Sequence, residues 1–228
     1  FTIVGGNQFC FVGFRSYLKI TYLIVLMSVR YLFGRRNVIQ SVGLESKYNK
    51  FQYYLVLLIF HLSNDSTVRD KESFDFLMSA RVKNIKLAPD AGYLYIKYSN
   101  LCKKNVRSSF KYDAMIFLSH HAVSDSSKIL LLIDGFEKNQ MIAVFAQSSQ
   151  DYTFALQLQK SCVRKLVVIR YCRENLVEHF HDFSLTRVFY VQRYHGAIIA
   201  ECCKAPWYIV GHTDKLNNLK NIVSEWKA

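Results

Sequence analysis

The stretch "YLVLLIFHLSNDSTVRDKESFDFLMSARVKNIKLAPDAGYLYIK", residues 54–97, decides which fold class the sequence predicts. Its first residues, 54–60, form a wholly apolar run of strand length. Segment 66–82 places apolar residues at helical spacing among polar ones, which predicts an amphipathic helix. Pro89 then ends that helix, and 93–97 reads as a second strand. Strand, helix and strand in this order predict a βαβ crossover and at least one parallel pair of strands.

The alternation of element types continues downstream of this stretch. The expected elements are a helix at 128–140, a strand at 141–147, a helix at 151–161 and a strand at 165–171. The apolar run 114–118 is expected to be an edge strand or one arm of an inserted hairpin. After Tyr171 the pattern becomes helical.

These elements predict an α/β fold with a mixed sheet flanked by helices and a helical tail at the C-terminal end. The predicted organisation has three parts. Residues 1–45 form a basic N-terminal extension, residues 46–187 form the α/β domain, and residues 188–228 form a C-terminal helical segment.

The charge balance indicates an anionic partner. The 228 residues include 30 Lys and Arg against 17 Asp and Glu, which gives a formal net charge of +13. A domain this basic usually meets a polyanion such as nucleic acid or an anionic membrane surface. Residues 1–44 contain no acidic residue, so this segment is predicted to be an extension that binds RNA or lipid.

Membrane and metal signals are weak in the sequence. The longest apolar run, at 20–29, is well short of the ~20 residues that cross a bilayer, so we expect no transmembrane helix. An interfacial helix is the less favoured alternative there. The six cysteines include no C-x-x-C pair, so Cys172 with the "HFH" of 179–181 is interpreted as ordinary surface or core residues. We expect no metal site and no cofactor.

The sequence shows no catalytic motif, so a non-enzymatic protein is expected. One rival interpretation is considered: "LLLIDGFE" at 130–137 is similar to the signature helix of the organellar LAGLIDADG homing endonucleases or of related maturase-like proteins. Asp134 would then be a metal-binding carboxylate. Leu131 and Leu132 stand where that motif needs small residues, so a core helix is favoured.

A resemblance to a known family is carried by "YLYIKYSNLCKKNV", residues 93–106. A strand followed by a polar turn and the basic pair Lys103 and Lys104 resembles the second strand and basic turn of the stalk-base protein of the large ribosomal subunit, called L-ten in bacteria and P-zero in archaea and eukaryotes. The helix ending in "FLMSARVKN" before it, and the helix, strand, helix and strand from 130 to 177 after it, are similar to the same family. The resemblance covers roughly 50–228.

This resemblance implies a structural role in translation as an organellar ribosomal protein. The residues expected to bind ribosomal RNA of the GTPase-associated region are Lys97, Tyr98, Asn100, Lys103, Lys104, Arg81 and Lys83. Lysines and arginines would contact phosphates and the aromatic ring would stack on unpaired bases. No small-molecule substrate is expected.

The C-terminal segment is expected to carry a docking surface for acidic stalk-protein dimers that recruit translation factors. Its apolar stripe consists of Leu216, Leu219, Ile222, Val223 and Trp226. The other implied partner is an L-eleven-type ribosomal protein. The basic, acid-free N-terminal segment favours a mitochondrial location, in the matrix on the mitochondrial ribosome, over a plastid one.

Overall fold

The computed structural model describes residues 1–4, 9, 11, 13–44, 48–99, 101, 109–120, 126–211 and 219. The chain divides into two compact units. The described residues of unit 1 lie within Phe1–Leu94, and those of unit 2 lie within Tyr95–Ser224. No helix among these residues reaches the length and apolarity that crossing a membrane requires.

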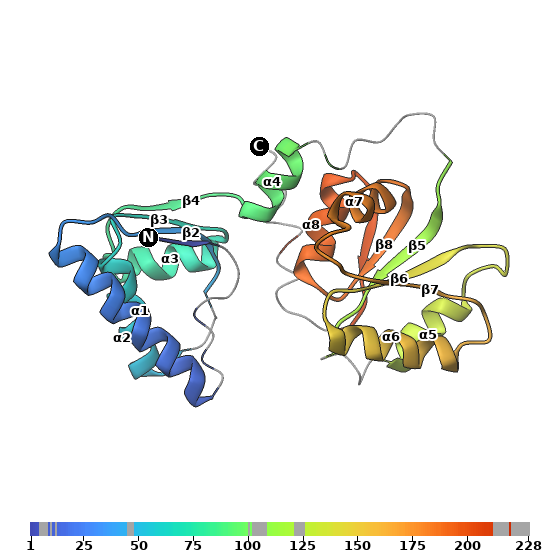
Figure 1. Cartoon of the computed structure of the whole chain (residues 1–228), viewed down its shortest axis with the longest axis horizontal. Coiled ribbons are helices and arrows are strands. Elements are labelled where there is room, and N and C mark those ends of the chain that lie inside the picture. The colour runs from blue at the N-terminus through green and yellow to red at the C-terminus, as the bar shows by residue number, and fades with distance from the viewer. Residues whose placement is uncertain are drawn as a thin grey trace. The chain divides into compact units, whose positions relative to one another are not determined.

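Unit 1 is a parallel β-sheet whose strands follow one another in chain order (Figure 1). Its elements are β1 (Thr2–Val4), α1 (Phe14–Leu32), β2 (Val38–Val42), α2 (Lys50–His61), β3 (Asp65–Val68), α3 (Lys71–Ser79) and β4 (Ile85–Leu87). The sheet has the order β1-β2-β3-β4, and each neighbouring pair is parallel. Parallel neighbours in chain order place successive crossover helices on one face of the sheet.

The core of unit 1 lies between this sheet and its helices. Ile39 and Val68 of the strands are fully buried with Met27 of α1, Phe60 of α2 and Leu77 of α3. One continuous apolar cluster therefore joins all three helices to the sheet.

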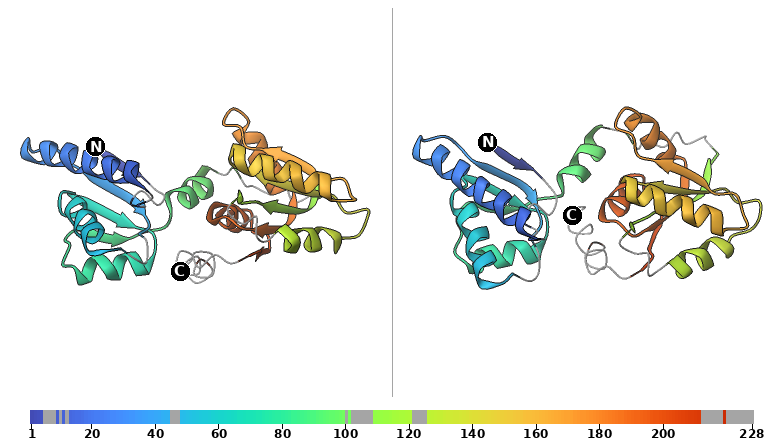
Figure 2. Two further views of the ribbon diagram at one scale, coloured as in Figure 1. Left: turned by 90° about the horizontal axis from the view of Figure 1, so that it is seen from below. Right: turned by 60° about the horizontal axis from the view of Figure 1, so that its bottom comes forward.

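Unit 2 is a second parallel sheet, which has helices packed around it (Figure 2). The strand order of this sheet reverses direction. Its elements are β5 (Tyr112–Phe117), α5 (Ser126–Asp134), β6 (Ile142–Ala146), α6 (Ser149–Ser161), β7 (Val167–Arg170), α7 (Leu176–Ser184), β8 (Thr186–Val191), α8 (Tyr194–Cys202) and β9 (Trp207–Ile209). The order is β7-β6-β5-β8-β9, with all neighbours parallel. Helix α4 (Ala91–Ser99) spans the boundary between the two units.

Strand β5 is the central strand of unit 2, and both faces of the sheet are covered there. Ala114, Ile116 and Leu118 pack with α5 and α6 on one side, while Phe117 contacts the ring of Phe183 of α7. A strand buried on both faces reads as a continuous apolar run. The prediction of an edge strand or hairpin arm at 114–118 is therefore wrong.

Two predicted strands are helices in the structure. Residues 54–60 belong to α2, which begins with a capping box between Asn49 and Gln52. Residues 93–97 belong to α4, in which Tyr93 and Ile96 are buried three positions apart. Neither segment shows a clear polar face, and short apolar runs of this kind do not distinguish strand from helix by periodicity.

Three further expectations differ from the structure. The predicted helix 66–82 is shorter because strand β3 precedes it and Asp70 caps α3. The helical region predicted after Tyr171 contains strands β8 and β9. Residues 1–45, predicted as an extension, contribute β1 and β2 to the sheet of unit 1.

The predicted fold class is confirmed at the level of an α/β protein with helices flanking its sheets, but the paired strands of both sheets are parallel rather than mixed. The chain does contain βαβ crossovers, but the one predicted from strands at 54–60 and 93–97 is not among them, because both segments are helical. The helix and strands predicted at 141–171 match β6, α6 and β7. The sequence-based boundaries at 45 and 187 do not coincide with the division near residue 94.

Candidate functional site

The strand order of unit 2 marks one place on its sheet where a ligand can enter. The chain winds from β5 outward to β6 and β7, then returns to the other side of β5 to form β8 and β9. The loops that follow β5 and β8 therefore lead to opposite sides of the sheet. The carboxyl ends of these two strands form a topological switch point, where open parallel sheets bind ligands. Unit 1 has no such reversal among its described strands.

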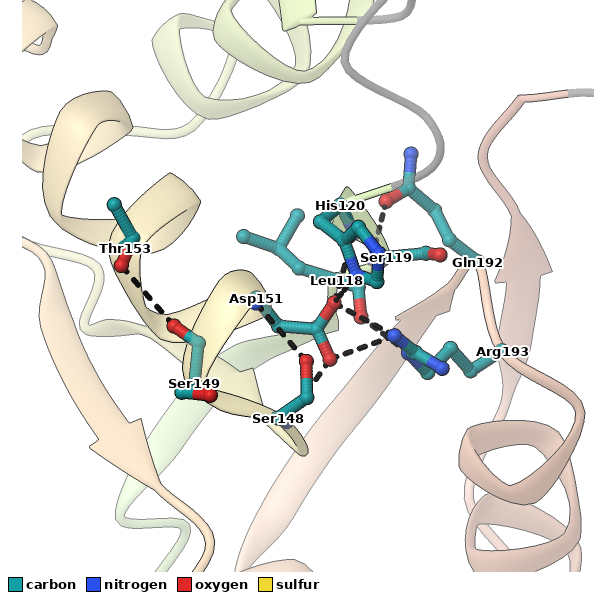
Figure 3. Close-up of polar contacts among 9 residues, drawn as sticks. All are labelled: Leu118, Ser119, His120, Ser148, Ser149, Asp151, Thr153, Gln192 and Arg193. Carbon is teal, nitrogen blue, oxygen red and sulfur yellow. Dashed lines mark hydrogen bonds and ion pairs between the residues drawn. The ribbon is translucent and has the colours of Figure 1, made fainter. Parts of the chain in front are cut away.

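Polar side chains converge on this switch point from three segments (Figure 3). His120 follows β5, Asp151 lies in the first turn of α6 after β6, and Arg193 follows β8. Nη2 of Arg193 donates to both carboxylate oxygens of Asp151, at 2.6 and 2.7 Å. Nε of Arg193 donates to the carbonyl oxygen of Leu118 at 3.0 Å, which fixes the guanidinium plane.

Asp151 is the anchor of the cluster and has no exposed side-chain surface. Its Oδ1 accepts a hydrogen bond from the backbone N–H of His120 at 2.8 Å and lies 2.9 Å from Nδ1 of that ring. Its Oδ2 accepts from the backbone N–H of Ser148 at 3.0 Å, and the Ser148 hydroxyl accepts from the backbone of Asp151. The carboxylate thus also caps α6, where the helix dipole favours a negative charge.

The environment keeps Asp151 ionised. Burial by itself would raise the pKa of this carboxyl, but hydrogen bonds from Arg193, from His120 and from Ser148 outweigh burial and hold the pKa well below its usual range. A permanent negative charge at this position keeps the Arg193 guanidinium and the His120 ring in fixed orientations.

The contact with Asp151 orients the His120 ring and favours one tautomer of it. An ionised carboxylate accepts the proton carried by Nδ1, so the neutral ring has its lone pair on Nε2, the nitrogen that lies away from Asp151. The His120 side chain is 25% exposed, against 26% for Arg193. An oriented, solvent-reaching imidazole beside a buried carboxylate can accept a proton from a hydroxyl group.

Gln192 lines the same switch point beside Arg193. Its Oε1 accepts from the backbone N–H of Ser119 at 3.0 Å, which joins the carboxyl ends of β5 and β8. Its Nε2 is buried and has no hydrogen-bond partner within the described part of the chain. A buried donor without a partner is costly unless a ligand or water completes it.

Helix α8 approaches this edge closely because residue 196 is glycine. A Cβ at Gly196 would lie 2.7 Å from Cγ of Phe117, the last residue of β5. The first turn of α8, which begins directly after Arg193, therefore sits against the end of the central strand. A helix N-terminus at this place favours bound anions.

The carboxyl edge of unit 1 also holds an arginine and a carboxylate, but both are enclosed. Nη1 of Arg69 donates to Oδ2 of Asp90 at 2.9 Å, and the two side chains are 7% and 4% exposed. A Cβ at Gly43 would lie 2.7 Å from Nε of Arg69. This pair ties the end of β3 to the loop after β4, and both of its side chains are almost fully enclosed.

The described residues expected to bind RNA lie on different elements. Lys97 and Tyr98 lie on α4, and Arg81 and Lys83 lie in the turn after α3. Asn100, Lys103 and Lys104 lie outside the described residues. The expected strand end that would present these side chains together is a helix, so the geometry behind that expectation is not present in the described part.

The expected docking stripe is described at only one position. Leu219 is fully buried, and Leu216, Ile222, Val223 and Trp226 lie outside the described residues. The described residues contain no group of three or more His, Cys, Asp or Glu side chains placed to hold a metal ion. His179, which the sequence analysis weighed as a metal ligand, is buried and accepts from the backbone of Cys172.

Sequence reasoning did not select His120, Asp151 or Arg193. They lie 31 and 42 residues apart along the chain. Each nevertheless follows an apolar run closely, in "IFLSHH", "FAQSSQD" and "FYVQR". Polar residues just past the ends of parallel strands meet at one edge of a sheet, and that signal was available once the strands were placed correctly.

The fold is that of a two-unit α/β protein, and unit 2 has a Rossmann-type strand order with the candidate site at its carboxyl edge. Two solved structures share this fold at 12% sequence identity. UDP-GlcNAc 2-epimerase from Methanocaldococcus jannaschii matches with a TM-score of 0.61 over 87% of this chain and 61% of that one. UDP-GlcNAc 2-epimerase from Neisseria meningitidis, bound to UDP-GlcNAc, matches with a TM-score of 0.54 over 91% and 71%. No curated protein sequence matches the chain.

A family model decides the relationship. The model for polysaccharide pyruvyl transferase matches residues 1–214, so the chain belongs to the polysaccharide pyruvyl transferase family. The chain spans 61% of the length of the Methanocaldococcus epimerase.

These matches overturn the functional expectations from the sequence. The resemblance to the ribosomal stalk-base family is wrong, and so are the expected ribosomal RNA, L-eleven-type and stalk-dimer partners. The family is one of transferases, so the expectation of a non-enzymatic protein without a small-molecule substrate is also wrong. The homing-endonuclease alternative is not supported either, and Asp134 is the last residue of an ordinary helix, α5. The stalk-base resemblance rested on the order of elements, and its key strand at 93–97 is part of helix α4.

Proposed function

We propose that the chain takes part in transferring a pyruvyl group from an anionic, activated donor to a hydroxyl group of a saccharide. The proposal places the donor at the switch point of unit 2. The observation that carries it is the cluster of Arg193, His120 and Asp151 in a chain of the polysaccharide pyruvyl transferase family.

Arg193 is proposed to bind the negative charge of the donor. A pyruvyl donor carries a carboxylate, and guanidinium groups bind carboxylates and phosphates through paired N–H donors. The bonds to Asp151 and Leu118 use Nη2 and Nε of Arg193. Those contacts leave the Nη1 side of the guanidinium to meet a ligand, with the first turn of α8 beside it.

His120 is proposed to accept the proton of the attacking hydroxyl. Transfer forms a bond between the saccharide oxygen and the pyruvyl carbon, and it breaks the bond from that carbon to the leaving group of the donor. The hydroxyl proton must pass to a base, and Nε2 of His120 is oriented for this by the contact between Nδ1 and Asp151. Asp151 acts as a positioning residue, because the ring and the guanidinium both depend on its buried charge.

The proposal is tested by incubating the purified chain with phosphoenolpyruvate, as an activated pyruvyl compound, and a panel of oligosaccharides. Mass spectrometry detects a saccharide that has gained a pyruvyl group. We expect product from the unaltered chain and at least a hundredfold slower formation with His120→Gln, the range of a general base. His181→Gln is the matched control, since His181 lies exposed on α7 in the same unit.

Arg193→Met tests the anion site separately. It is expected to raise the donor concentration needed for half-maximal rate at least tenfold, because a charge-assisted contact is lost. The control is Arg187→Met, an exposed arginine on β8. Product formation that responds equally to the site variants and to their controls would contradict the proposed roles. If all four variants still form product at the unaltered rate, the chemistry takes place elsewhere in the chain.

A further inference from the structure

Helix α1 carries an exposed apolar face that the core of unit 1 does not use. The exposed apolar side chains on it are Phe14, Leu18, Tyr22, Val25, Val29 and Leu32. At 3.6 residues per turn these six positions fall within an arc of roughly 80° along the whole helix. The opposite side supplies the buried Ile20 and Met27. Helix α1 is thus apolar on two faces, and only one of them packs against the sheet.

Helix α2 extends this exposed face. The rings of Tyr17 and Phe51 stack at 6.2 Å, and Gln52 donates to the hydroxyl of Tyr17, so the two helices lie side by side (Figure 1). On α2, Phe51, Tyr54 and Leu58 are exposed at helical spacing. Scattered apolar residues on a surface are ordinary, but a contiguous group over two helices marks an interaction site. We call the nine residues on the two helices the apolar face.

The charges around the apolar face have one sign. Residues 1–64 contain seven Lys and Arg and one acidic residue, Glu45. Arg15 lies exposed in the first turn of α1, and Arg35 and Arg36 lie exposed just after its end. Lys50 begins α2. Positive side chains therefore border an apolar surface at both ends of α1.

We infer that the apolar face of unit 1 is a peripheral attachment site for an anionic membrane surface. A helix that lies in the plane of a lipid interface has bulky apolar and aromatic residues on one side and Lys or Arg beside them. A polyanion would contact only the positive charges and would leave the aliphatic Leu18, Val25 and Val29 exposed to water. The acyl chains of a membrane would bury these side chains. The inference rests on unit 1 alone and does not depend on the site in unit 2.

The test uses the full chain and extruded vesicles made of phosphatidylcholine alone or of an equal mixture with phosphatidylglycerol. Sedimentation of the vesicles measures the bound fraction. We expect binding to the mixed vesicles, at least tenfold weaker binding to phosphatidylcholine, and release as salt is raised, because salt screens exposed charges. Leu18→Ser, Tyr22→Ser and Val25→Ser together should weaken binding to the mixed vesicles at least tenfold.

Matched controls separate this surface from general stickiness. Leu131→Ser, Val163→Ser and Val177→Ser remove three exposed apolar side chains of unit 2 and should leave binding unchanged. Arg15→Gln, Arg35→Gln and Arg36→Gln should weaken binding to the mixed vesicles at least tenfold. Circular dichroism confirms that each variant is folded, as expected for changes at exposed positions.

Three outcomes would overturn the inference. The first is no binding to either kind of vesicle. The second is binding that the arginine substitutions abolish and the serine substitutions leave intact, which would indicate a general polyanion site. The third is a self-associated species that the serine substitutions of α1 dissociate without any vesicle binding, since the face would then join copies of the chain.

Discussion

The two units carry the same chemical pair at the carboxyl edge of a parallel sheet, and burial gives the pairs different roles. Arg69 and Asp90 of unit 1 are 7% and 4% exposed, whereas Arg193 of unit 2 is 26% exposed beside a fully buried Asp151. Strand order explains the difference. The reversal between β5 and β8 opens an edge in unit 2, and the sequential order of unit 1 does not. An Arg–Asp pair becomes a candidate site only where the topology leaves the guanidinium accessible.

The largest expected effect is on unit 1, with Asp90→Asn. This change removes the charge of Asp90 from its contact with the enclosed guanidinium of Arg69, and breaking a buried ion pair costs about 3–5 kcal/mol. Amide hydrogen exchange read by mass spectrometry gives the opening free energy of each unit separately. We expect the loss in the segments of unit 1 and none in unit 2. An unchanged unit 1 would show that the pair is not a structural tie.

A smaller loss is expected in unit 2 from Asp151→Asn. The variant keeps the size of the side chain but loses its charge-assisted hydrogen bonds, and such bonds contribute about 1.5–3 kcal/mol. The pKa of Asp151 is lowered in the folded state, so its stabilisation is present above the ordinary value near 3.8 and is lost as pH falls through the folded value. The difference between the two proteins, followed by urea unfolding, should therefore shrink below about pH 4. A difference that stays constant with pH would contradict the role of the charge.

Gly196→Ala is expected to cost about 1–3 kcal/mol, because a new methyl group overpacks the contact between α8 and Phe117. The ring of Phe117 is buried against Phe145, Phe183 and Phe189, so it has little room to move. Gly135→Ala is the control, since the nearest atom to its Cβ is 3.4 Å away. Thermal unfolding compares the two variants. Equal stability of both would indicate that α8 shifts freely.

The smallest effect concerns His179 in the core of unit 2. Burial lowers the pKa of this imidazole, so the neutral ring is favoured in the folded state. Its contribution to stability is present above the ordinary value near 6.5 and declines as pH falls through the lower, folded value. His179→Gln, which still offers an acceptor to the backbone N–H of Cys172, should remove this pH dependence. If the free energy of unfolding of both proteins changes equally between about pH 7 and 5, where histidines titrate, His179 is excluded as the source of that change.

The sequence predicted those elements whose residues separate clearly into buried and exposed positions. Helix α6 has a capping box at Ser148 and Asp151, and strands β6 and β7 are short runs rich in β-branched residues. Helices α1 and α2 lack that separation because they are apolar on exposed positions as well. For α2, the missing polar face removed the periodicity that tells a helix from a strand.

The candidate site could not be assembled from the sequence because it depends on topology. His120, Asp151 and Arg193 come from three loops, and only the order of β6, β5 and β8 in the sheet brings them together. Reading β8 as part of a helical region removed the loop that carries Arg193. The basic composition was interpreted as a sign of nucleic-acid binding. In the structure, some of the basic residues border the apolar face on α1 and α2.

We propose that the open edge of unit 2, and not the enclosed edge of unit 1, receives the anionic donor. Hydrogen exchange of the full chain with and without phosphoenolpyruvate tests this claim directly, since a bound ligand slows exchange where it contacts backbone amides. We expect slower exchange at 118–120 and 192–197, no change at 42–44 and 68–70, and loss of the effect in Arg193→Met. Slower exchange confined to the edge of unit 1, or an undiminished effect in Arg193→Met, would contradict it.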